Sequence, residues 1–153
     1  MKKMNNKGFS LVELIIVIAI MAILIVVLAP QYLKYVEKSR NSTDLQSATE
    51  FKDAIEIWAA DPDAGTGGTT AFKSGDTFDI VVSATGATGY SDACKSALAN
   101  AGLAESKLKC TSKTRWSTFT LKGAVQSDGS IKWSYESTPA NAFAEAMGEK
   151  TTP

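Results

Sequence analysis

The distribution of apolar residues divides the chain into a long hydrophobic stretch and a more polar remainder. Twenty residues without a charge, Leu14–Leu33, lie between Glu13 and Lys34. As an α-helix they would span roughly 30 Å, about the thickness of the hydrocarbon core of a bilayer. Many of them are β-branched, but a segment in lipid must pair its own backbone groups, and this requirement favours the helix. The pattern predicts a membrane-spanning helix over residues 9–33.

Apolar residues continue beyond Lys34 in steps of three and four, which is typical of one face of a helix. The apolar positions are Leu45, Ala48, Phe51, Ile55 and Trp58, and the acidic residues expected on the other face are Asp44, Glu50 and Asp53. Residues 34–61 are therefore predicted to form an amphipathic helix half that packs on a globular body.

Two prolines bear on the length of this helix. Pro30 has no N–H to donate to the carbonyl of Val26, so a kink is expected there. Pro62 biases Asp61 away from the helical region and supplies a stop. The sequence thus predicts one continuous helix that bends at Pro30 and ends near Asp61.

The remainder, residues 62–153, is predicted to be a C-terminal globular region of short elements. They are a loop at 63–76, strands at Thr77–Ser83, Trp116–Gln126 and Ser130–Ser137, a turn at Ala84–Gly89, a helix at Asp92–Ala101 capped by Ser91, and a helical turn within Pro139–Gly148. Asp128-Gly129 predicts a hairpin turn between the last two strands. This order predicts an α+β fold, a long N-terminal α-helix packed on a small antiparallel β-sheet.

Composition excludes several classes of function. The chain is 44% hydrophobic and 21% charged, which suits a globular protein. It has no histidine, so Ser-His-Asp and Cys-His catalysis is excluded together with the commonest metal ligand. The formal net charge of zero gives no support to nucleic-acid binding. No enzyme activity, cofactor or metal is expected.

The apolar run opens with the octet Lys7-Gly8-Phe9-Ser10-Leu11-Val12-Glu13-Leu14. This octet resembles the prepilin signature of bacterial type IV pilins, in which a basic head and a glycine precede an apolar helix with glutamate at its fifth position. The tetrapeptide Ala29-Pro30-Gln31-Tyr32 resembles the end of the conserved pilin helix. The resemblance covers roughly residues 1–60.

The resemblance implies a processing site and an assembly residue. Residues 1–8 would be a leader that a prepilin peptidase removes by cutting between Gly8 and Phe9, and Phe9 would then be N-methylated. Glu13 would pair with the freed α-amine of Phe9, from the same chain or a neighbour, and so guide each subunit into register.

The chemistry of the segment agrees with these roles. Gly8 has no side chain, so a membrane protease can approach the following bond closely. Lys2, Lys3 and Lys7 precede the apolar helix and favour an N-in orientation. An ionised Glu13 in the apolar run costs a few kcal/mol without a partner, and an α-amine is a natural counter-ion.

The resemblance further implies the structural subunit of a type IV pilus, which serves adhesion, twitching motility or DNA uptake. The precursor would cross the inner membrane once and the assembled filament would be extracellular. Its partners would be other pilin copies, the prepilin peptidase, the pilus assembly platform and, before assembly, membrane lipid. The alternative is a pseudopilin of a type II secretion or competence system. Residues 1–33 fit a pseudopilin as completely as they fit a pilin.

Two simpler interpretations of the N-terminus are open. One is a secretory signal peptide cleaved after Ala29, and the other is a single-span anchor. Neither uses Gly8, Phe9 and Glu13 together.

Cys94 and Cys110 are expected to form one disulfide in an exported protein, closing a loop of 17 residues. Two buried free thiols are the alternative. Asn41-Ser42-Thr43 matches a glycosylation sequon, but it lies on the predicted helix, and a solvated helix face is the preferred explanation.

Overall fold

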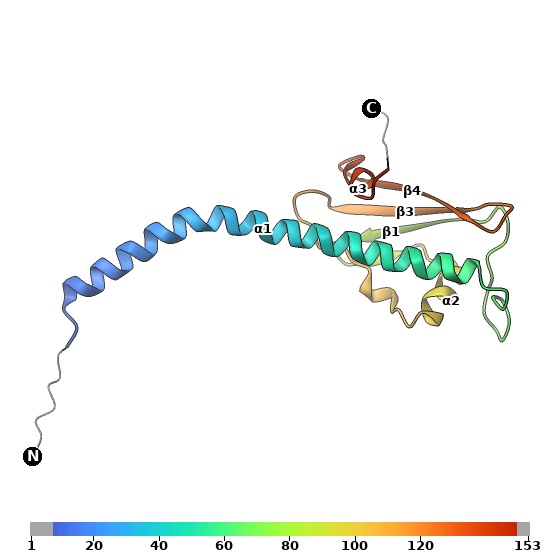
Figure 1. Cartoon of the computed structure of the whole chain (residues 1–153), viewed down its shortest axis with the longest axis horizontal. Helices are drawn as coiled ribbons and strands as arrows, with labels where there is room; N and C mark the ends of the chain where they lie inside the picture. The colour runs from blue at the N-terminus through green and yellow to red at the C-terminus, as the bar shows by residue number, and fades with distance from the viewer. Residues whose placement is uncertain (1–7, 150–153) are drawn as a thin grey trace, which may run out of the picture. The chain divides into compact units, whose positions relative to one another are not determined.

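The structure, a computed structural model, describes residues 8–149, so residues 1–7 of the predicted leader, 1–8, lie outside the described residues. Its elements are α1 (Leu11–Ala59), β1 (Thr77–Ser83), β2 (Gly86–Thr88), α2 (Asp92–Asn100), the 3-10 helix η1 (Glu105–Lys107), β3 (Thr118–Val125), β4 (Ile131–Thr138) and α3 (Ala142–Ala146) (Figure 1). The long N-terminal helix and the antiparallel sheet confirm the predicted α+β class. The chain divides after Val36 into two compact units.

The described part of the first unit is dominated by the first half of α1. All side chains from Gly8 to Tyr35 are exposed, although most of them are apolar. This half of α1 is apolar enough, and the helix long enough, to cross a membrane. Packing within the chain does not account for its apolar residues, so their burial requires lipid or another protein.

The second unit begins at Glu37 and contains the amphipathic half of α1. The predicted stripe is confirmed, because Ala48, Phe51, Ile55 and Trp58 are buried. The expectation that Asp44 lies on the opposite, solvent-facing side is wrong, since its exposed fraction is 0%. The sequence pattern failed there because a carboxylate can be buried when the rest of the chain supplies hydrogen-bond donors.

The sheet has the order β2-β1-β3-β4, and each neighbouring pair is antiparallel. The three predicted strands are confirmed, with ends that differ by at most two residues. The segment predicted as a turn at 84–89 is instead partly a strand, β2, which pairs with the end of β1. Its three residues are too few to show an alternation of apolar and polar positions, which explains why the pattern missed it.

The predicted hairpin turn at Asp128-Gly129 is confirmed. The N–H of Gly129 donates to the carbonyl of Gln126, and Gly129 has a φ of +83°. A turn followed by a left-handed residue is a common three-residue hairpin connection, and glycine adopts that conformation without strain.

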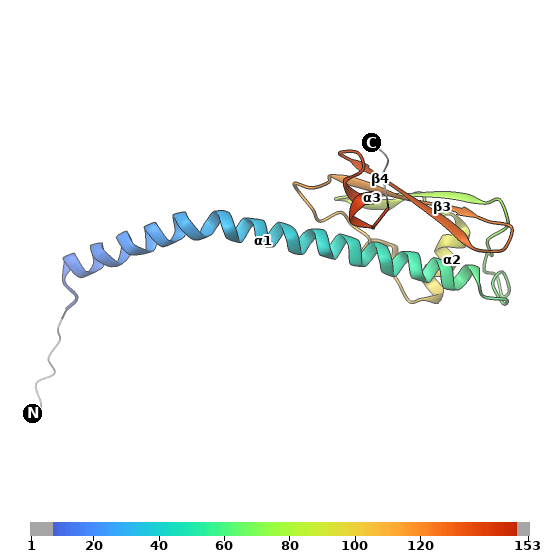
Figure 2. The same cartoon turned by 45° about the horizontal axis from the view of Figure 1, so that its top comes forward.

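The inner face of the sheet lies along the second half of α1 in both views (Figures 1 and 2). β3 alternates half-buried and buried residues along its whole length, as expected for a strand with one covered face. Phe143 of α3 closes the core by stacking on Phe119, with ring centroids 4.0 Å apart, and by packing edge-on against Trp116. The core therefore joins α1, the sheet and the C-terminal segment.

Candidate assembly site and the loop docked on the first helix

The predicted processing site is exposed, and among residues 8–149 no other atom crowds it. A Cβ atom at Gly8 would meet no other atom within 4 Å, and Phe9 is 91% exposed. Because the fold would tolerate a side chain at Gly8, any need for glycine there must come from a protein that binds this segment.

Glu13 lies in the first turn of α1 and makes a local hydrogen bond. Its Oε2 accepts a hydrogen bond of 2.8 Å from the backbone N–H of Ser10, the residue before the helix. A glutamate in the third helical position commonly satisfies that N–H in this way. The sequence singled out Glu13 as the partner of the Phe9 α-amine, from the same chain or a neighbour. It did not predict this helix cap, which the spacing Ser10-x-x-Glu13 could have revealed.

α1 continues through Pro30 without interruption. Helical geometry on both sides is compatible with a proline whose missing N–H leaves one carbonyl without its usual partner. The sequence indicated that the helix continues past Pro30, and it does. The kink expected at Pro30 stays a prediction.

A buried carboxylate, Asp44, holds the loop that precedes β3 against α1. Its Oδ1 accepts from the Thr111 N–H at 2.7 Å and the Thr111 hydroxyl at 2.6 Å. Its Oδ2 accepts from the Ser112 N–H at 3.0 Å and from the indole N–H of Trp116 at 2.8 Å. Four donors surround a group that can only accept when ionised, so the burial of Asp44 is compensated.

Glu37 lies two turns before Asp44 and holds the next part of the same loop. Its Oε1 accepts from the Ser112 hydroxyl at 2.8 Å and from the N–H groups of Lys113 and Thr114 at 2.6 and 2.9 Å. Partial burial acts to raise the pKa of Glu37, but these hydrogen bonds outweigh it and lower the pKa to about 2. We call Glu37, Asp44 and the loop Thr111–Trp116 the carboxylate clamp.

Sequence reasoning missed the carboxylate clamp. Glu37 and Asp44 are seven residues apart and share a helix face, and the loop Thr111-Ser112-Lys113-Thr114 is rich in small donors. Neither signal identifies the other, because the two segments are about 70 residues apart in the chain and meet only through the fold.

The two cysteines are present as buried thiols in the core of the second unit. Cys94 is on α2, where it contacts the hydroxyl of Ser91 at 3.1 Å, and Cys110 directly precedes the clamp loop. Burial raises the pKa of both thiols, that of Cys110 to about 11, with the nearby Asp44 carboxylate adding to the effect. The disulfide expected from the sequence stays a prediction.

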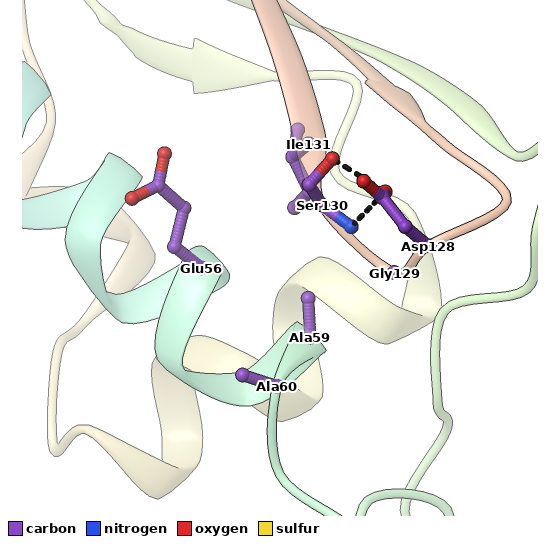
Figure 3. A pocket seen from close by; sticks show the side chains of 7 residues that line it. All are labelled: Glu56, Ala59, Ala60, Asp128, Gly129, Ser130 and Ile131. Carbon is purple, nitrogen blue, oxygen red and sulfur yellow. Dashed lines mark hydrogen bonds between the residues drawn. The ribbon is translucent and has the colours of Figure 1, made fainter.

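A groove of about 640 Å³ lies between the end of α1 and the β3–β4 hairpin. Figure 3 shows Glu56 on one side and the hairpin residues on the other, where Asp128 accepts bonds from the Ser130 N–H and hydroxyl. Glu56 itself accepts from the indole N–H of Trp133 at 2.7 Å. The carboxylates of Glu56 and Asp128 at this groove thus accept hydrogen bonds from the chain's own donors.

Within residues 8–149, no three histidine, cysteine, aspartate or glutamate side chains are grouped so that they could hold a metal ion. The candidate functional features of the chain are the exposed apolar half of α1 with Glu13 and the carboxylate clamp.

Comparison with known proteins identifies the family. The profile of the prokaryotic N-terminal methylation motif matches residues 3–29. The fimbrial protein EcpC of Eikenella corrodens is 33% identical over 140 residues, which cover 87% of this chain and 84% of that protein. Two type IV major fimbrial proteins FimA of Dichelobacter nodosus are 38% and 39% identical over 63 and 59 residues, about two fifths of each chain. No solved structure matches the chain.

The three findings agree with one another. The methylation motif covers the octet that opens the apolar run, and the alignment with EcpC extends over most of the globular region as well. With its exposed apolar helix half and antiparallel sheet, the chain belongs to the type IV pilin family.

Proposed function

We propose that this pilin is inserted in the membrane as a precursor, is cut between Gly8 and Phe9, and polymerises into a pilus through the first half of α1. As a pilin it is a structural fimbrial subunit and not an enzyme. The single observation that carries the proposal is the exposure of every side chain from Gly8 to Tyr35 in a helix half that is otherwise apolar.

Two environments can cover such a surface in turn. Before assembly the bilayer covers it, since the helix is long and apolar enough to cross a membrane. In the filament, the same surface packs against equivalent helices of other copies, and close packing replaces contact with lipid. The leader lysines Lys2, Lys3 and Lys7 favour a cytoplasmic N-terminus, which places the second unit outside.

Glu13 is the residue to which we assign subunit register. It is the one acidic side chain between Gly8 and Val36, and it accepts a hydrogen bond from the local Ser10 N–H. Cleavage after Gly8 would create a positive α-amine on Phe9 within one helical turn of this carboxylate. In a bundle of apolar helices an ion without a counter-ion is costly, so a neighbouring amine stabilises the correct register.

The N-terminus of the assembled protein tests the proposal. Mass spectrometry of filaments sheared from native cells should find a first residue Phe9 carrying one methyl group. Electron microscopy of the same fraction should show long fibres that antibodies against this chain decorate. A first residue Pro30, an intact Met1, or the absence of such fibres would contradict the proposal.

A further inference from the structure

We propose that a basic patch on the second unit binds anionic phospholipid head groups while the subunit is held in the membrane. The patch consists of Lys38, Arg40, Lys109, Lys113 and Arg115. The inference rests on the membrane stage of the proposed function, and it identifies the lipid surface as a partner of the globular unit rather than of the apolar helix alone.

The carboxylate clamp brings the two segments of the patch together. Lys38 and Arg40 are on α1, and Lys113 and Arg115 are on the clamp loop more than 70 residues later. The Lys113 N–H donates to the Glu37 carboxylate at 2.6 Å, and the Thr111 hydroxyl donates to the Arg40 carbonyl at 3.2 Å. These bonds hold the loop that contains Lys113 and Arg115 against the turn of α1 that contains Lys38 and Arg40.

The chain itself limits the distance from this patch to the end of the apolar run. Glu37 follows Leu33, the last residue of the uncharged stretch, by four positions. Four residues span at most about 14 Å even when fully extended. Whatever the angle between the two units, the clamp loop cannot lie far from the surface of the membrane that residues 14–33 occupy.

The two acidic residues of this region, Glu37 and Asp44, face the loop rather than the solvent, so they do not cancel the positive charge that the patch presents to a membrane. Asp44 is 0% exposed and the Glu37 side chain 14%, and both accept hydrogen bonds from the loop. Lys38, Lys109 and Lys113 are exposed and have no ion pair among residues 8–149, whereas Arg40 lies 3.4 Å from Glu37 and Arg115 lies over the ring of Trp116. Lysine ammonium groups are thus left to face the solvent.

The charge of the patch opposes that of the rest of the unit. Segments 37–44 and 109–116 contain five basic and two acidic residues, whereas the remainder of residues 37–153 contains seven basic and thirteen acidic ones. A cluster of basic residues next to a membrane span is attracted by anionic lipids, and each residue near the surface adds to the attraction. The concentration of positive charge next to the apolar run therefore favours lipid as the partner.

Amine labelling of the full chain in vesicles tests the inference. The chain is reconstituted in vesicles of phosphatidylcholine alone or of phosphatidylcholine and phosphatidylglycerol in equal parts, recovered by flotation and acetylated with a membrane-permeant reagent. We expect Lys38, Lys109 and Lys113 to be acetylated at least about threefold more slowly in the anionic vesicles, and the protection to disappear in about 0.5 M salt. Lys73 and Lys132, exposed on other parts of the unit, are internal controls and should not respond.

A charge-reversal pair provides the matched variant. In K113E/R115E, the remaining patch lysines Lys38 and Lys109 should lose most of their dependence on lipid composition. The control K132E changes another exposed lysine, outside the patch, and should keep that dependence. Far-UV circular dichroism of both variants shows whether the fold is retained.

The outcomes separate this inference from the proposed function. If the chain floats with both vesicles but its patch lysines react equally in both, the lipid surface is not a partner and the membrane insertion still stands. If the chain does not float with vesicles at all, the proposed function and this inference both fail. Protection that is independent of lipid composition but rises with the ratio of protein to lipid would mean that a second copy covers the patch, and it would overturn the inference.

Discussion

The two halves of α1 carry acidic residues in opposite situations. In the first half, Glu13 is exposed among apolar side chains and accepts a hydrogen bond from the neighbouring Ser10 N–H. In the second half, Glu37 and Asp44 together accept seven hydrogen bonds from a loop that is distant in sequence. Within one helix, Glu37 and Asp44 accept hydrogen bonds from a distant part of their own chain, whereas Glu13 accepts one local bond and is exposed to a second chain.

This difference corresponds to two tasks. A carboxylate surrounded by donors from its own chain stabilises the fold of a single subunit, since removing it leaves those donors buried without partners. A carboxylate in an apolar, exposed surface contributes little to that fold and is available to a second chain. Substitutions at the three positions should therefore separate folding from assembly, and the expected effects below run from the largest to the smallest.

Asp44→Ala should give the largest effect, and on folding. The change leaves the Trp116 indole N–H and the N–H groups of Thr111 and Ser112 without acceptors, at a cost of about 3–5 kcal/mol in the free energy of unfolding. In thermal unfolding the midpoint of the globular unit should fall by about 10–20 °C. Glu50→Ala is the control, because Glu50 is exposed and accepts a single bond from Gln46. Equal midpoints for the two variants would show that the clamp does not hold the loop.

The cysteines should add a second constraint to the same unit if the exported protein is oxidised. A bridge between Cys94 and Cys110 would close a 17-residue loop and stabilise the fold by about 3 kcal/mol in the chain-entropy model. The intact mass of protein from native cells should then be two hydrogen masses below that of the reduced chain. Two alkylatable thiols in the unfolded, non-reduced protein would instead establish the free thiols described above.

Glu13→Leu should leave the unfolding midpoint unchanged and reduce assembly. We expect the ratio of sheared filament to membrane-held mature protein to fall by at least tenfold, which corresponds to about 1.4 kcal/mol. Glu13→Gln sharpens the test, because glutamine can still accept from the Ser10 N–H but carries no charge. Loss of assembly in both variants identifies the charge as the cause, and loss in the leucine variant alone identifies the helix cap. Assembly of the leucine variant at the level of the unsubstituted chain would remove Glu13 from the assembly site.

Glu37→Gln should cause the smallest change, about 1 kcal/mol of lost stability at neutral pH, because a neutral amide accepts weaker hydrogen bonds than a carboxylate. The pKa of Glu37 is lower in the folded chain, at about 2, than its ordinary value of 4.5. Its contribution is therefore complete above pH 4.5 and is lost as the pH falls towards 2. The difference in unfolding midpoint between the two proteins should shrink over that interval, and a constant difference from pH 7 to pH 2 would contradict the assignment.

The comparison also shows which local features the sequence could predict. The strand Thr77–Ser83 and the Ser91 cap of α2 are found where the patterns predicted them, and the Gln126–Ser130 connection closes as its glycine indicated. These features depend on neighbours within a few residues, so local preferences determine them. β2 was missed because it exists through its pairing with β1 rather than through a pattern of its own.

The sequence by itself determined the apolar run, the processing octet and the lone position of Glu13 within that run. These are properties of consecutive residues, and a bilayer or a peptidase acts on consecutive residues. The sequence could not determine that Asp44 is buried. The donors that compensate this burial come from residues 111–116 and meet the helix only after folding. The carboxylate clamp and the basic patch beside it were decided by the tertiary structure, since a buried charge is stable only where distant segments supply its hydrogen bonds.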